Sequence, residues 1–463
     1  MDRSTRPETH YAAPSALVQG KFVDDVIIAV DERGDIVSVG QGRQSGAIPL
    51  KGIVLPGMPD VHSHAFQRAM AGLAERASPV GDNFWSWREA MYRFAEHVGP
   101  EDIEAIAAQL YVELLRHGFT TVAEFHYMHN APDGSAYADP AELSKRIAVA
   151  ARTSGIGLTL LPVLYQTSGF GGRPPTEGQR RFIRTSSNFI KLVEALQSNF
   201  EGDPQVVVGI APHSLRAITP QSLEEAVEAI TRLNKDAPIH IHAAEQDREV
   251  DDCLAWSGER PIDWLLNHAP VDRRWCLIHC TQATDSEIAR LAASGAVAGL
   301  CPSTEANLGD GVFPLPSYLR QGGMFGIGTD SNVGVSPADE LRWLEYVQRL
   351  VNKQRNLSES ESGAHTGAGL FCRALAGGAQ ACGRKIGEIA PGYRADLVVL
   401  DSDHPALIGH RGETAIDAWV FSGNDTPVRD VMVGGRFVVE NGRHRAQDDI
   451  FARYRRCITG LIG

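Results

Sequence analysis

The chain has 463 residues, of which 43% are hydrophobic and 22% are charged, and its formal net charge at pH 7 is −13. This composition predicts a soluble globular protein with two domains and argues against extensive disorder. No basic block that could follow a phosphate backbone is present, so we expect no nucleic-acid partner. Residues 1–11 lack an apolar signal segment, and no apolar stretch reaches the roughly 18 residues that span a bilayer, which predicts a cytoplasmic protein without membrane contact.

The seven cysteines are scattered along the chain without a C-x-x-C pair. Neither a disulfide framework nor a cysteine-rich zinc site is therefore indicated. We expect all of them to be reduced residues that pack as small hydrophobic side chains.

Both ends of the chain carry short β-type runs separated by turn residues, in the ranges 15–40 and 395–442. Such runs are typical of β-sandwiches. We predict one β-sandwich built from both termini, residues 1–59 and 386–463, beside a central domain of residues 60–385.

In the central part, eight short apolar runs alternate with helical stretches such as 101–117, 222–234 and 286–294. Buried parallel strands have this continuous apolar character, and eight alternations indicate an α/β fold of the (β/α)8 TIM-barrel type. The expected strands are 53–58, 120–125, 157–164, 206–211, 238–242, 275–279, 296–301 and 325–329.

Ionisable residues stand at the ends of several of these strands. His62 and His64 follow the first, His242 and His279 end the fifth and sixth, and Asp330 follows the eighth. Residues i and i+2 of a strand point the same way, so His62 and His64 can reach one ion. One H-x-H pair alone is equally compatible with a structural role, but its recurrence at the carboxyl ends of barrel strands indicates a one-metal hydrolytic site.

Several segments together resemble the amidohydrolase superfamily: Pro56-Gly57 before His62-Ser63-His64, His242-Ala243-Ala244-Glu245, His279, Gly328-Thr329-Asp330-Ser331, and the run from Pro391 to Leu397. This resemblance implies a metal-dependent TIM barrel with a β-sandwich from both ends of the chain. Two-metal members carry a carboxylated lysine on strand four, whereas the run 206–213 has no lysine. The chain is therefore more similar to the mononuclear deaminases.

Further segments are similar to the formimidoylglutamate deiminases, namely 62–73, 84–88, 123–127, 213–216 and 303–311. This resemblance implies hydrolytic deimination of N-formimino-L-glutamate to N-formyl-L-glutamate and ammonia in histidine degradation. It also implies a homodimer and a small dicarboxylate substrate.

The metal ligands that the resemblance implies are His62, His64, His242 and Asp330. Three neutral imidazoles and one carboxylate suit zinc, so we predict one Zn²⁺ per chain. The same donors would accept Fe²⁺ or another divalent ion.

Three residues are predicted to carry the chemistry. Asp330 orients and deprotonates the water, and Glu245 moves the proton to the departing nitrogen. His279 hydrogen-bonds the attacking oxygen or acts as an outer ligand. The structural alternatives are a turn-initiating aspartate at Asp330 and a solvated helix-start glutamate at Glu245.

A substrate with two carboxylates needs fixed cations, because guanidinium groups bind carboxylates through two parallel hydrogen bonds. The expected substrate-binding residues are Arg88, Arg216, Gln67, Tyr127 and His213. Each of them, taken alone, is also compatible with a surface or packing role. Packing or lid roles are expected for Arg68, His126, Trp85 and Trp87, and a core role for His240.

Two other functions remain open at this stage. A deaminase or chlorohydrolase of a purine, pyrimidine or triazine would share the metal set, but a neutral heterocycle gives paired arginines nothing to neutralise. An inactive scaffold would keep the fold, but loss of at least one ligand is then expected.

Overall fold

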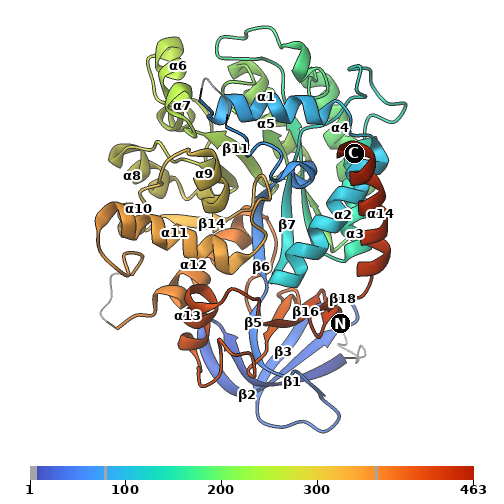
Figure 1. Cartoon of the computed structure of the whole chain (residues 1–463), viewed down its shortest axis with the longest axis vertical. Coiled ribbons are helices and arrows are strands. Elements are labelled where there is room, and N and C mark those ends of the chain that lie inside the picture. Colours follow the sequence, from blue (N-terminus) through green and yellow to red (C-terminus); the bar gives the residue numbers. More distant parts are fainter. Residues whose placement is uncertain (1–7, 78–80, 360–362, 463) are drawn as a thin grey trace.

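The computed structural model describes residues 8–77, 81–359 and 363–462. A barrel with surrounding helices forms the upper part of Figure 1, and a sheet built from both ends of the chain forms the lower part. None of the described helices is long and apolar enough to cross a membrane. All seven cysteines lie within the described residues, and each is a free thiol.

The barrel sheet contains only parallel pairings, and its path runs β10-β8-β7-β6-β14-β13-β12-β11. Its last gap is bridged by a parallel contact between Ile210 and Ile239. The short strands β9 and β10 both pair with β8 and share the fourth position. The predicted (β/α)8 fold is therefore confirmed. The strands are β6 (Met58–Ser63), β7 (Phe119–His126), β8 (Gly157–Leu164), β9 (Val206–Val208), β10 (Ala211–Pro212), β11 (Ile239–Ala243), β12 (Trp275–His279), β13 (Val297–Leu300) and β14 (Met324–Ile327).

The helices of the barrel begin and end at sequence signals that can be recognised locally. Thr219 and Thr284 cap α5 and α8 in capping boxes, and Gly118 and Gly155 end α2 and α3 in the left-handed conformation. The three predicted helices correspond to α2, α5 and α8. The helices are α2 (Pro100–His117), α3 (Glu142–Ser154), α4 (Ser186–Asn199), α5 (Pro220–Leu233), α6 (Asp247–Ser257), α7 (Pro261–His268), α8 (Asp285–Ser294), α9 (Pro302–Leu308), α10 (Leu315–Arg320), α11 (Pro337–Asn352) and α12 (Thr366–Ala381).

The first predicted barrel strand, 53–58, is wrong. The structure splits this apolar run at Gly57: β5 (Ile53–Pro56) pairs with β1 and β15 of the second sheet, and β6 enters the barrel only from Met58. A Cβ atom at Gly57 would lie 2.2 Å from the side chain of Thr120, so only glycine lets the chain pass from one sheet to the other here.

The second sheet has the order β18-β17-β16-β15-β5-β1-β2-β3, with β4 beside β1. Strands from both termini therefore meet at β5. Side chains such as Val54, Leu397 and Met432 form a separate core, whereas Leu55, Val398 and Val431 join the core of the barrel. A separate sheet from both termini is thus confirmed, whereas the domain bounds 1–59, 60–385 and 386–463 stay a prediction. The strands are β1 (Glu8–Val18), β2 (Lys21–Asp31), β3 (Ile36–Gln41), β4 (Ile48–Pro49), β15 (Leu397–Leu400), β16 (Val428–Val433), β17 (Arg436–Glu440) and β18 (Arg443–His444).

Two C-terminal helices return to the barrel. Helix α13 (Glu413–Ser422) packs on α11 and α12, and α14 (Gln447–Ile462) packs along α2. Figure 1 shows α14 beside α2 and α3, on the flank of the barrel.

Candidate metal and catalytic site

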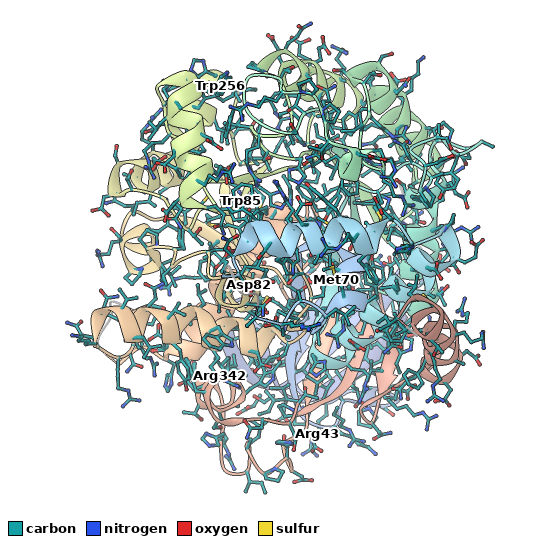
Figure 2. The ribbon with its side chains drawn as sticks, turned by 45° about the horizontal axis from the view of Figure 1, so that its top comes forward. Arg43, Met70, Asp82, Trp85, Trp256 and Arg342 are labelled. Atoms are coloured by element: carbon teal, nitrogen blue, oxygen red, sulfur yellow. The ribbon has the colours of Figure 1, made fainter. Side chains whose placement is uncertain are left out.

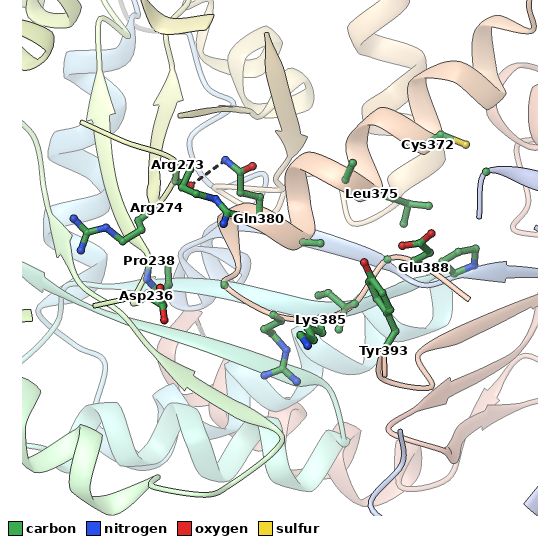
Figure 3. A pocket seen from close by; sticks show the side chains of 18 of the residues that line it. Asp236, Pro238, Arg273, Arg274, Cys372, Leu375, Gln380, Lys385, Glu388 and Tyr393 are labelled. Carbon is green, nitrogen blue, oxygen red and sulfur yellow. Dashed lines mark hydrogen bonds between the residues drawn. The ribbon is translucent and has the colours of Figure 1, made fainter. Parts of the chain in front are cut away.

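The barrel has a cavity at each end, and they differ in size and lining. A cavity of about 860 Å³ lies at the amino ends of the strands, against the second sheet. Its lining includes Asp236, Gln380, Lys385, Glu388 and Tyr393 (Figure 3). A cavity of about 50 Å³ lies at the carboxyl ends. Barrel enzymes place their chemistry at the carboxyl ends, so the smaller cavity is the candidate site.

Four buried side chains from three strands meet beside the smaller cavity. The Nε2 atoms of His62 and His242 are 3.1 Å apart, and Asp330 Oδ1 lies 3.3 Å from Nε2 of both His62 and His64. All four residues are at most 5% exposed. The strand-end residues that were predicted from the sequence are therefore brought to one point.

The chemistry of these donors fits a divalent cation. The Nδ1 atoms of His64 and His242 lie 2.9 Å and 3.0 Å from the carbonyl oxygens of Phe125 and His213. A carbonyl only accepts, so each Nδ1 carries the hydrogen, and each Nε2 presents a lone pair to the common centre. Burial lowers the pKa of His62 to about 3 and also lowers the pKa values of His64 and His242. Neutral imidazoles facing one another with a carboxylate suit zinc or iron.

Glu245, His279 and Arg216 form a second buried group next to these donors. Glu245 Oε1 is 3.7 Å from His279 Nε2, and Glu245 Oε2 is 3.4 Å from Arg216 Nη2. Burial raises the pKa of Glu245 to about 7, although His279 and Arg216 act in the opposite direction. Burial lowers the pKa of His279, but the carboxylate of Glu245 and the hydrogen bond to Glu305 outweigh it and raise this pKa to about 10. Glu245 is only 4% exposed, so it is not a solvated helix-start residue.

Asp330 stays ionised in this setting. Burial acts to raise its pKa, but the hydrogen bond to His62 and the nearby imidazoles outweigh burial and keep the pKa below its ordinary value. Its backbone is left-handed, with φ of 47°, as are those of Ala244 and His279 with φ of 52° and 72°. Such strain in non-glycine residues clusters at functional sites.

The five predicted substrate-binding residues all line the same cavity: Gln67, Arg88, Tyr127, His213 and Arg216. The amide of Gln67 donates to the hydroxyl of Tyr127 at 2.7 Å. The ring of His213 lies 4.8 Å from that of His242. The cavity wall therefore joins the neutral donors and both guanidinium groups to the metal-binding side chains.

Arg88 enters this wall from α1 (Phe84–Ala95), which Figure 2 shows lying across the barrel end with Trp85 near its start. Its guanidinium lies 4.6 Å from the centre of the Trp85 ring. Its Nε is buried and has no hydrogen-bond partner among the described residues. An unpaired buried guanidinium edge is a docking point for an anion.

The comparisons with known proteins agree with this geometry. A profile of the amidohydrolase family matches residues 53–438. The chain is 55% identical over 418 residues to formimidoylglutamate deiminase of Pseudomonas aeruginosa. The alignment covers 90% of each chain. The chain belongs to the amidohydrolase family.

Other members are similar to different degrees. A crystal structure of an amidohydrolase from Brucella melitensis has a TM-score of 0.93 at 47% identity and covers 98% of this chain and 100% of that one. A 5-methylthioadenosine/S-adenosylhomocysteine deaminase of Natronomonas pharaonis is 27% identical over 427 residues, covering 91% of this chain and 90% of the relative. Deaminases of purine compounds are thus more distant relatives than the formimidoylglutamate enzyme.

Of the five residues for which packing, lid or core roles were expected, four lie outside the reacting centre of this amidohydrolase. Arg68 pairs with Glu113 at 2.8 Å, and His126 packs against the ring of His129. His240 donates to the carbonyl of Ala381 at 2.8 Å and lies lower in the barrel, as expected for a core residue. Trp85 stacks on arginines, whereas Trp87 lines the cavity.

The sequence interpretation missed several buried groups that support this amidohydrolase site. Asp60 accepts the N–H of His62 and the hydroxyl of Thr329, and the side-chain amide of Asn332 donates to the carbonyl oxygens of His64 and Asp330. The spacing of Asp60, two residues before His62 on the same strand, was a usable signal. Glu305, which accepts from His279 Nδ1 at 3.3 Å, follows a different strand and had no such signal.

Proposed function

We propose that this amidohydrolase converts N-formimino-L-glutamate and water to N-formyl-L-glutamate and ammonia, a step of histidine degradation. The observation that carries the proposal is the presence of two guanidinium groups, Arg88 and Arg216, in the cavity that also holds the converging imidazoles and carboxylates. The 55% identity to a formimidoylglutamate deiminase supports the same substrate.

We propose one zinc ion per chain, held by His62, His64, His242 and Asp330. A bound zinc supplies Lewis acidity, which makes water a usable nucleophile at neutral pH. The same four donors would hold Fe²⁺, because imidazole and carboxylate suit both metals.

The proton transfers are assigned to two carboxylates. Asp330, ionised and next to the imidazoles, orients the attacking water and takes its proton. Water adds to the formimino carbon, and the bond from that carbon to the terminal nitrogen breaks. Glu245, with its pKa raised to about 7, is suited to give the proton to the departing nitrogen, so that ammonia leaves. His279, 3.7 Å from Glu245, stabilises negative charge on the attacking oxygen.

The guanidinium groups are assigned to the two carboxylates of the substrate. Arg88 has an unpartnered edge, and Arg216 is buried at 9% exposure. Gln67, Tyr127 and His213 add donors between them and the reacting carbon. Holding both carboxylates orients the formimino group over the site, which lowers the entropy cost of reaction.

The second candidate is deamination of a purine, pyrimidine or triazine. The more distant relative, named as a 5-methylthioadenosine/S-adenosylhomocysteine deaminase, supports the purine case. A neutral heterocycle would offer no carboxylate to either guanidinium group of the cavity, and Nε of Arg88 would stay without a partner. An inactive scaffold is disfavoured because all four ligand candidates converge within hydrogen-bonding or ion-pair distance.

The test is ammonia release from N-formimino-L-glutamate by the zinc-loaded protein, with chelator-stripped protein as the control. Guanine, cytosine and adenosine are assayed in parallel. Metal-dependent release with N-formyl-L-glutamate as the product is the expected result. Turnover of a heterocycle without turnover of N-formimino-L-glutamate would establish the second candidate instead. A protein that binds no metal would point to the scaffold.

The resemblance to formimidoylglutamate deiminases supports a homodimer, and a cytoplasmic location is a further part of the proposal. Equilibrium sedimentation of the purified protein and fractionation of the producing cell test them.

A further inference from the structure

Glu249 is a fully buried carboxylate, 0% exposed, that does not line the cavity. It is the third residue of α6, and its side chain turns back toward the preceding turn. Its two carboxylate oxygens accept the backbone N–H groups of Ala244 at 3.3 Å and Glu245 at 3.1 Å. Ala244 has the left-handed φ of 52°, so these bonds hold a strained turn that carries Glu245.

The same carboxylate faces the substrate-binding guanidinium. Arg216 Nε is 3.8 Å from Glu249 Oε2, while Arg216 Nη2 is 3.4 Å from Glu245 Oε2. Arg216 therefore has an acid at each of two edges: Nη2 donates a hydrogen bond to Glu245, whereas Nε makes no hydrogen bond and contacts Glu249 as an ion pair. A substrate carboxylate that binds Arg216 competes with Glu245 for the guanidinium, because both carry the same charge. Glu249, on the other edge and outside the cavity, is not displaced by the substrate.

We propose that Glu249 is a positioning residue for deimination. It holds Arg216 in place while the Nη2 edge of Arg216 exchanges its contact with Glu245 for a contact with a substrate carboxylate. This inference rests on the proposed function. Glu249 thereby links substrate recognition to the turn that presents Glu245 for proton transfer. A neutral side chain at this position leaves Arg216 with Glu245 as its nearest acid, so the substrate carboxylate must compete for a guanidinium that is no longer anchored.

The neighbouring βα unit offers a matched control, since Glu287 occupies the same position in α8. It is also 0% exposed, accepts the N–H and the hydroxyl of Thr284 at 2.9 Å each, and pairs with Arg260 at 2.8 Å. Arg260 does not line the catalytic cavity. Glu287 therefore has the structural role of a buried helix-start glutamate without a contact to the substrate-binding arginine.

The experiment compares zinc-loaded Glu249→Gln and Glu287→Gln with the wild type. We measure kcat and KM for N-formimino-L-glutamate, calorimetric binding of N-formyl-L-glutamate, and thermal unfolding. Loss of one charged interaction is expected to raise KM and weaken product binding about tenfold in Glu249→Gln, with a similar loss in kcat, so that kcat/KM falls about 100-fold. Glu287→Gln is expected to stay within about twofold in kcat, KM and product binding, since neither Glu287 nor Arg260 lines the catalytic cavity.

A second substitution background isolates the link to Arg216. In Arg216→Met, the further change Glu249→Gln should raise KM no more, because the group it holds is gone. If Glu249→Gln does not fold, Glu249→Asp serves in its place: it keeps the charge but shortens the reach, and a smaller loss of product binding is expected.

Equal kinetic losses in Glu249→Gln and Glu287→Gln, or an additive rise of KM in the Arg216→Met background, would overturn the positioning role. The same holds if Glu249→Gln behaves as the wild type. Failure of the proposed function is a different result, because the wild type itself would then neither turn over N-formimino-L-glutamate nor bind N-formyl-L-glutamate, and both proposals would fall.

Discussion

The cavity at the amino ends of the barrel strands encloses about 860 Å³ and the one at the carboxyl ends about 50 Å³, yet only the small one has the character of a reaction site. In the large cavity, some polar groups pair locally: Arg274 pairs with Asp272 at 3.0 Å, and the amide of Gln380 donates to the carbonyl oxygens of Arg273 and Gly295. Nε of Arg384, which also lines this cavity, has no hydrogen-bond partner among the described residues, but no imidazole converges with a carboxylate there. Figure 3 shows the bond from Gln380 to Arg273 at the cavity wall.

In the small cavity, imidazoles, carboxylates and guanidinium groups face one another instead. Nε2 of His62 lies 3.1 Å from Nε2 of His242 and 3.3 Å from the carboxylate of Asp330, and Nε of Arg88 has no hydrogen-bond partner among the described residues. Buried groups that lack partners are costly, so they persist where a ligand satisfies them. The difference shows that convergence of buried imidazoles, carboxylates and guanidinium groups, rather than cavity volume, distinguishes the candidate site.

The largest expected effect tests the metal donors. Asp330→Asn removes the carboxylate that lies 3.3 Å from both His62 and His64, and should lower metal content and reduce kcat by about 10³-fold or more, as loss of a whole catalytic unit does. Metal analysis and ammonia release measure this. Retention of metal and rate would mean that the four donors do not act together.

Glu245→Gln should keep the metal and lose about 10²–10⁴-fold in kcat, because general acid–base catalysis contributes that much. The separation of metal content from turnover distinguishes proton transfer from metal binding. Turnover close to that of the wild type would remove Glu245 from the mechanism.

Arg216→Met should raise KM by about 10- to 100-fold, while its thermal unfolding should change little by comparison, since a charged contact to the substrate is lost. Steady-state kinetics and a melting curve check this together. A large fall in the melting temperature with KM unchanged would give Arg216 a purely structural role with Glu245 and Glu249.

The smallest effect is expected in the large cavity. Lys385 lines it and is exposed. Lys385→Met should therefore change the free energy of unfolding by at most about 0.5 kcal/mol, as surface substitutions usually do, and leave kcat and KM as in the wild type. A kinetic change as large as that of Arg216→Met would contradict the conclusion that only the small cavity is the reaction site, and would assign the amino-end cavity a part in the reaction.

Much of the fold follows from local patterns. The apolar runs that end in His242 and His279, and the capping boxes at Thr219 and Thr284, are short-range signals, and they predict strands and helices close to those observed. The prediction of one barrel strand at residues 53–58 was wrong because this apolar run contributes to two different sheets. Which sheet each half joins is decided by the close passage of Gly57 past Thr120, a contact between distant segments.

For this protein, the sequence by itself determined the barrel, the sheet built from both termini and the residue types at the strand ends, because hydrophobic periodicity and strand polarity act locally. Only the tertiary structure decided which of these side chains contact one another. The hydrogen bond from His279 to Glu305 and the position of Arg216 between Glu245 and Glu249 join separate βα units. Such pairings depend on how the strands close into a barrel, and no spacing along the chain encodes them.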